Sequence, residues 1–127
     1  MSTETTPYAL IGGEATVRAL VHRFYQLMDE LPEAWEVRKL HPESLEGSAE
    51  KLYLYLTGWL GGPQLYVERF GHPRLRARHM PFPVDTQVRD QWLMCMKQSL
   101  EENVTDPAIR DKLYRQMADL ADFMRNH

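Results

Sequence analysis

Cysteine is almost missing from this sequence of 127 residues, in which Cys95 is the only example. A single thiol excludes an internal disulfide framework and fits a reducing compartment. A basic excess is missing too, because 15 Lys and Arg residues stand against 18 Asp and Glu residues, a formal net charge of −3. Proteins that bind nucleic acids or anionic membranes carry the opposite balance, so we expect neither partner.

Long apolar runs and targeting segments are also missing. The first seven residues are polar, so we expect no signal peptide and no membrane span. No glycine-rich phosphate loop, nucleophile elbow or His-Glu-x-x-His motif occurs, which sets aside several common enzyme classes. The sequence therefore predicts one cytoplasmic globular domain over residues 1–127, with a polar and flexible N-terminus over residues 1–7.

Three segments show the three- and four-residue spacing of apolar side chains that predicts amphipathic helices. The first follows the Gly12-Gly13 pair and should end at Pro32, and the second begins just after Asp85. The third follows Asp106-Pro107, a pair typical of a helix N-terminus. The apolar positions are Val17, Leu20, Val21, Phe24, Leu27, Met28 and Leu31; Val88, Trp92, Cys95 and Leu100; and Ile109, Leu113, Met117, Leu120 and Met124.

The segment from Leu52 to Leu60 is apolar or aromatic almost throughout, so it shows no clear period. Its aromatic residues favour a strand, but no second strand is evident to pair with it. We therefore predict a buried helix that Ser48 caps and that ends at Gly61-Gly62-Pro63. From there to Asp85 we expect one long, irregular, proline-punctuated connection, and hence an all-α fold of short helices.

His79 is the first residue with candidate chemistry. It lies in a constrained segment rich in proline and arginine, where it is either a metal ligand or a surface histidine. No second His or Cys stands at a spacing typical of metal ligands, but a haem needs only one protein ligand. Tyr25 and Trp92 are either residues at the edge of the core or hydrogen-bond donors inside a pocket.

The remaining candidates have simple structural explanations. His41 precedes a proline and on its own reads as a turn residue. Ser48 and Leu52 are four residues apart and share a helix face, with Lys51 beside them. A capping serine, a core leucine and a solvated lysine would account for all three.

Several motifs in this order resemble the truncated haemoglobins of the second group, the bacterial O-type proteins, over most of the chain. The matching motifs are Arg23-Phe-Tyr25, His41-Pro-Glu43, Gly47-Ser-Ala-Glu-Lys-Leu52, Trp59-Leu-Gly-Gly-Pro63, Gly71-His-Pro-Arg-Leu-Arg-Ala-Arg-His79-Met-Pro-Phe82 and Asp90-Gln-Trp92-Leu-Met-Cys95. The resemblance implies a globin-like, two-over-two helical sandwich in which the long connection replaces most of the proximal helix.

The resemblance also implies the site. His79 matches the proximal ligand of haem iron, and the haem is haem b, held without covalent links because no Cys-x-x-Cys-His motif occurs. Tyr25 and Trp92 match the distal donors, and His41 matches a turn position held by tyrosine or histidine.

The same resemblance gives roles to residues near the middle of the chain. Ser48 stands where larger globins carry a distal histidine, and Leu52 would cap the distal pocket one turn later. Lys51 would reach a haem propionate, while Phe82, together with Leu52 and Trp92, would line the haem.

The function implied is reversible binding of dioxygen and related diatomic ligands. The alternative is a haem-based redox enzyme, a peroxidase or a nitric oxide dioxygenase, at the same site. A rival from another class is a helical interaction module without a cofactor. A reductase is the candidate protein partner, and the chain is expected to be a monomer or a homodimer.

Overall fold

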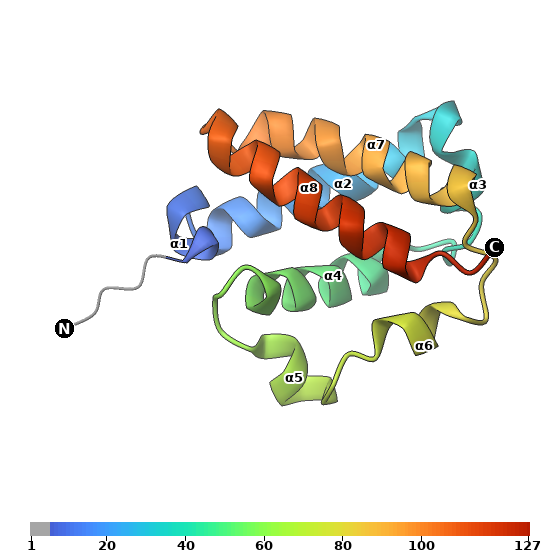
Figure 1. Cartoon of the computed structure of the whole chain (residues 1–127), viewed down its shortest axis with the longest axis horizontal. Helices are drawn as coiled ribbons and strands as arrows, with labels where there is room; N and C mark the ends of the chain where they lie inside the picture. Colours follow the sequence, from blue (N-terminus) through green and yellow to red (C-terminus); the bar gives the residue numbers. More distant parts are fainter. Residues whose placement is uncertain (1–5) are drawn as a thin grey trace.

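The structure is a computed structural model that describes residues 6–127, and over that range all regular secondary structure is helical. This confirms the predicted all-α class. Within the same range no helix combines the length and the apolar character that crossing a bilayer requires. In chain order the helices are α1 (Pro7–Ile11), α2 (Glu14–Glu30), the 3-10 helix η1 (Pro32–Ala34), α3 (Trp35–Arg38), α4 (Glu46–Trp59), α5 (Leu65–Phe70), α6 (Leu75–His79), α7 (Thr86–Asn103) and α8 (Pro107–Met124) (Figure 1).

The first helix begins inside the N-terminal segment that the sequence predicts to be flexible. Residues 1–5, part of the predicted flexible segment, lie outside the described residues. Thr6 and Pro7, which were expected to be flexible as well, begin α1: the Thr6 hydroxyl accepts a hydrogen bond from Ala9 N at 3.2 Å, and Pro7 is the first helical residue. A capping threonine followed by proline is a favourable helix start, so these two residues form the N-terminus of α1.

The three long amphipathic helices form where the sequence predicts them. Helix α2 ends directly before Pro32. The Asp85 carboxylate accepts from Val88 N at 2.9 Å at the start of α7, and the Asp106 carboxylate accepts from Ala108 N at 2.9 Å at the start of α8. These caps satisfy backbone donors that have no partner inside the helix.

Helix α4 confirms the helical interpretation of residues 52–60 but begins earlier than predicted. It starts at Glu46, so Ser48 lies inside the first turn and is not the N-cap. The Ser44 hydroxyl instead accepts weakly from Glu46 N at 3.4 Å. At the other end Gly61 has φ +94°, a conformation that residues with a Cβ rarely adopt, and the helix stops there as predicted.

The predicted irregular connection between Gly61 and Asp85 contains two short helices, α5 and α6. The four prolines of this connection, Pro63, Pro73, Pro81 and Pro83, all lie outside the two helices. An isolated helix of five or six residues is not stable in water, so these two helices depend on packing against other helices. Segments this short also show too few apolar positions to give a clear period in the sequence. Helix α5 packs against α4, and α6 packs against α8.

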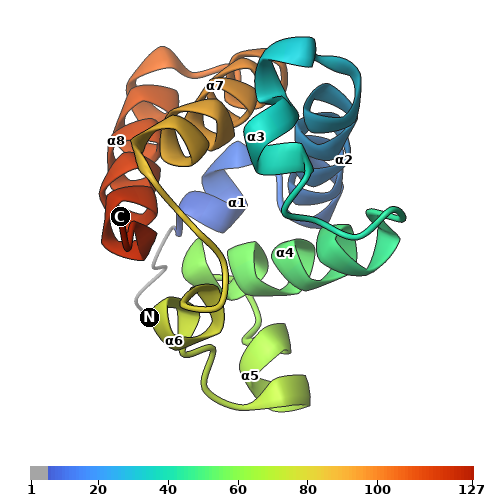
Figure 2. The same ribbon diagram turned by 90° about the vertical axis from the view of Figure 1, so that its right-hand side faces the viewer.

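The four long helices form two packed pairs, α2 with α4 and α7 with α8. The pairs are joined by the contact of α2 with α7. Figures 1 and 2 place α4 below α7 and α8, with α5 and α6 further out on that lower side. This is the two-over-two arrangement predicted from the sequence. Inside it the Ser99 hydroxyl donates to Leu20 O at 2.6 Å, which joins α7 to α2 between two fully buried residues.

Candidate functional site

Four aromatic rings from three segments form a continuous series of edge contacts. Trp92 on α7 meets Phe24 on α2, with ring centroids 5.1 Å apart. Phe24 meets Tyr25 at 4.9 Å, and Tyr25 meets His41 at 5.9 Å. Such edge-to-face geometry is favourable for aromatic pairs. The structure therefore brings together three of the five predicted distal residues, Tyr25, His41 and Trp92.

The Tyr25 hydroxyl and the Trp92 indole N–H are donors without a protein partner among residues 6–127, and neither polar atom is fully enclosed. Tyr25 is buried, and this burial raises the pKa of its hydroxyl well above the ordinary 10.0. The hydroxyl therefore keeps its proton at neutral pH. Two available donors beside an apolar ring cluster are suited to a small ligand that accepts hydrogen bonds.

His41 contributes a different kind of group. Its Nδ1 lies 2.9 Å from Val37 O. Burial lowers the pKa of His41 below 6.5, and the nearby Arg38 guanidinium lowers it further, against a smaller opposing effect of the Val37 carbonyl. The neutral ring donates to Val37 O through Nδ1, so its Nε2 carries a lone pair and accepts hydrogen bonds.

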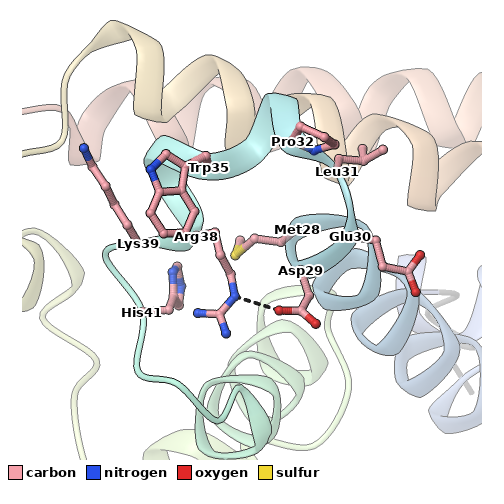
Figure 3. A pocket seen from close by; sticks show the side chains of 9 residues that line it. All are labelled: Met28, Asp29, Glu30, Leu31, Pro32, Trp35, Arg38, Lys39 and His41. Atoms are coloured by element: carbon pink, nitrogen blue, oxygen red, sulfur yellow. Dashed lines mark hydrogen bonds and ion pairs between the residues drawn. The ribbon is translucent and has the colours of Figure 1, made fainter.

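Arg38 holds the turn that contains His41. Its guanidinium donates to the Asp29 carboxylate at 2.9 Å, to Pro42 O at 3.0 Å and to Glu43 O at 2.8 Å. Figure 3 shows Arg38 directed toward Asp29 between the end of α2 and this turn. Arg38 was not predicted, because hydrogen bonds to backbone carbonyls leave no motif in the sequence.

A surface pocket of about 450 Å³ lies beside the same turn (Figure 3). Its lining includes His41 and the buried Met28, so it approaches the aromatic cluster from outside. The remaining lining residues are Asp29, Glu30, Leu31, Pro32, Trp35, Arg38 and Lys39.

His79 is the last residue of α6 and is half-buried. Its Nδ1 lies 2.6 Å from Leu75 O, and with the proton on Nδ1 the ring donates to that carbonyl. The Nε2 lone pair then remains available, which is the usual arrangement of a metal-binding histidine. The described residues contain no group of three or more His, Cys, Asp or Glu side chains that could hold a bare metal ion.

Large apolar side chains on α5 and directly after α6 stay exposed. Met80 and Phe82, directly after α6, are 57% and 43% exposed, and Val67 and Phe70 on α5 are 44% and 41% exposed. Met80 and Phe82 follow His79 within three residues of the chain, so they offer apolar surface to a flat group, such as a haem, held at the His79 imidazole.

Helix α4 carries the other predicted site residues. Ser48 and Leu52 are half-buried, and Leu52 packs against the apolar core. Lys51 is exposed, which fits the prediction that it reaches a charged group at the edge of the site. Within residues 6–127 no hydrogen bond joins these three side chains to Tyr25, His41 or Trp92, so their roles remain predictions.

Comparison with known proteins identifies a globin family over nearly the whole chain. The model of the bacterial-like globin family matches residues 6–126. The group 2 truncated hemoglobin YjbI of Bacillus subtilis (strain 168) is 38% identical over 120 residues, which cover 94% of this chain and 88% of that protein.

Two solved structures have nearly the same fold. The group II 2-on-2 hemoglobin of Agrobacterium tumefaciens is 48% identical, with a TM-score of 0.95 and coverage of 98% of this chain and 97% of that chain. The cold-adapted truncated hemoglobin of Pseudoalteromonas haloplanktis TAC125 is 41% identical, with a TM-score of 0.95 and coverage of 97% and 99%. The chain belongs to the bacterial-like globin family and, within it, to the group II truncated haemoglobins.

Proposed function

We propose that this protein binds haem b without covalent links and reversibly binds dioxygen and related diatomic ligands. His79 is the only protein ligand of the iron, and Tyr25 and Trp92 donate hydrogen bonds to the diatomic ligand. The observation that carries the proposal is the pair of available donors, the Tyr25 hydroxyl and the Trp92 N–H, on one apolar ring cluster. Membership of the globin family supports the haem.

Haem supplies an iron centre at which a diatomic ligand binds, and the chain's own side chains fit such a group. The His79 ring presents Nε2 because Nδ1 is bonded to Leu75 O at 2.6 Å. Phe82, together with Leu52 and Trp92, offers apolar surface to the flat ring system. The exposed Lys51 ammonium is available to a propionate, a pairing of modest strength at the surface.

The distal residues stabilise a ligand that carries partial negative charge. The Tyr25 hydroxyl and the Trp92 N–H each contribute about 1 kcal/mol or somewhat more in a dry, aligned site. Leu52 limits the volume of the distal pocket. Ser48 stands where larger globins carry a distal histidine, so no imidazole from α4 donates to the ligand. The neutral His41 ring accepts through Nε2 and donates no hydrogen bond to the ligand. Its contribution is to pack edge to face against the Tyr25 ring and hold that ring in place.

The proposal also covers the cellular compartment and the partners of the protein. A reductase keeps the iron ferrous, and the cytoplasm keeps Cys95 reduced; burial already raises the pKa of this thiol to about 11 and makes it unreactive. We expect a monomer or a homodimer with no nucleic-acid partner.

Absorption spectroscopy tests the proposed function. The purified chain, or the chain after addition of haem, should show a Soret band, and its ferrous form should bind dioxygen and release it when the gas is removed. No Soret band after haem addition would contradict every haem function. Rapid irreversible oxidation together with turnover of peroxide would instead support the redox enzyme.

A further inference from the structure

The segment after α8 is bonded directly to the segment that carries His79. Asn126 Nδ2 donates to His79 O at 3.3 Å and to Phe82 O at 2.8 Å. Asn126 Oδ1 accepts from Val84 N at 3.0 Å, and Asn126 N donates to Val84 O at 2.9 Å. One residue thus bonds to three residues of the stretch 79–84.

The chemistry of the asparagine side chain matches these partners. A carboxamide has two N–H donors on one side and a carbonyl acceptor on the other. Two backbone carbonyls, of His79 and Phe82, meet the donor side, and one backbone N–H, of Val84, meets the acceptor side. Aspartate has no donor in its ionised form, so it satisfies only the Val84 partner.

Helix α6 depends on such external bonds for its position. It has five residues and packs against α8, and a helix of that length has no stability of its own. The Arg76 guanidinium donates to Phe123 O at 2.7 Å at the end of α8. The Leu75 carbonyl fixes the His79 ring relative to α6, while Asn126 fixes the backbone that leaves α6.

We infer that Asn126 is a positioning residue for His79: by bonding the carbonyls of His79 and Phe82 and the backbone of Val84, it holds the His79 imidazole in place for haem iron. The inference rests on the proposed function, in which His79 is the iron ligand. Without Asn126 the 79–84 segment opens more often, since local opening follows the number of bonds that hold a segment.

Asn126→Ala tests this inference, and Asn103→Ala is the matched control. The sequence has only these two asparagines, and Asn103 Nδ2 donates to Ser99 O at 2.9 Å within α7. On haem-loaded protein, the iron–histidine stretching band of the ferrous form and the rate of haem transfer to an acceptor apoglobin are measured. Asn126→Ala should displace or broaden the band and speed haem loss about tenfold. Asn103→Ala should match the wild type in both.

An Asn126→Ala protein with the wild-type band and the wild-type haem loss would overturn the inference. Asn126→Asp, close in shape, keeps the acceptor for Val84 N and loses both donors, so it gives the same test if the alanine variant does not fold. It should change both readouts in the same direction as alanine. Failure of the proposed function gives a different result: the iron–histidine band would persist in His79→Ala.

Discussion

The His41 imidazole meets the Tyr25 phenol ring edge to face, with the ring centroids 5.9 Å apart and the planes at 74°. This contact joins the turn after α3 to the middle of α2, and the bond from His41 Nδ1 to Val37 O fixes the imidazole. The neutral His41 ring therefore faces its neighbours with an acceptor, Nε2. The donating roles belong to Tyr25 and Trp92.

The half-buried position of His41 makes the stability of the protein depend on pH. Burial and the nearby charges lower its pKa below 6.5 in the folded chain, so the unfolded chain takes up a proton at higher pH than the folded chain. The free energy of unfolding should therefore fall as the pH drops below about 6.5. In His41→Gln the fall between about pH 7.5 and about pH 5.5 should be smaller.

Urea unfolding of the haem-free wild type and of His41→Gln at the two pH values measures this difference. An equal loss of stability on acidification in both proteins would show that His41 does not contribute.

The Ser99 hydroxyl stabilises the contact between α7 and α2. Ser99→Ala removes its bond to Leu20 O in a fully buried position, and we expect a loss of about 1 kcal/mol in the free energy of unfolding. Ser44→Ala, at an exposed position, should change stability by less than about 0.5 kcal/mol. Urea unfolding of the haem-free proteins compares the two, and equal effects would contradict the role of the buried bond.

The long helices could be predicted because their signals are local. The spacing of apolar residues from Val17 to Leu31, and the Asp106-Pro107 cap, depend on neighbours in the sequence, and the structure agrees with both. The start of α4 could not be read in this way. Ser48 is a good capping residue, but the N-cap is Leu45, which makes no side-chain capping bond, so the true start of α4 carries no capping signal in the sequence.

The site residues also divide into those that could be predicted from the sequence and those that could not. Tyr25, His41 and Trp92 come from separate segments, so their convergence followed from the resemblance to a family and from no spacing rule. Arg38 and Asn126 were missed because each acts on backbone carbonyls of residues that only the fold brings near. Helices α5 and α6 were missed because packing, and not a periodic pattern, stabilises them.

The distal donors give a prediction that separates hydrogen bonding from steric effects. Tyr25→Phe and Trp92→Phe should each raise the dissociation rate of dioxygen about tenfold, since ~1.4 kcal/mol corresponds to that factor. The two effects should not add, because the remaining donor and pocket water can form new bonds. Carbon monoxide carries less charge when bound, so its dissociation should respond far less.

Stopped-flow dissociation of both gases from the two variants and the double variant measures these rates. Equal changes for both gases would point to steric gating. An unchanged dioxygen rate in the double variant would place neither side chain at the ligand.

The central claim is that His79 binds the haem iron, and resonance Raman spectroscopy of the ferrous protein tests it most directly. His79→Gly should lose the iron–histidine stretching band and release haem readily, and added imidazole should restore a band and haem retention. His72→Gly, at an exposed histidine whose Nδ1 accepts from Arg74 N at 3.1 Å, should keep the wild-type band. A His79→Gly protein that keeps its band and its ferrous spectrum without added imidazole would contradict the account.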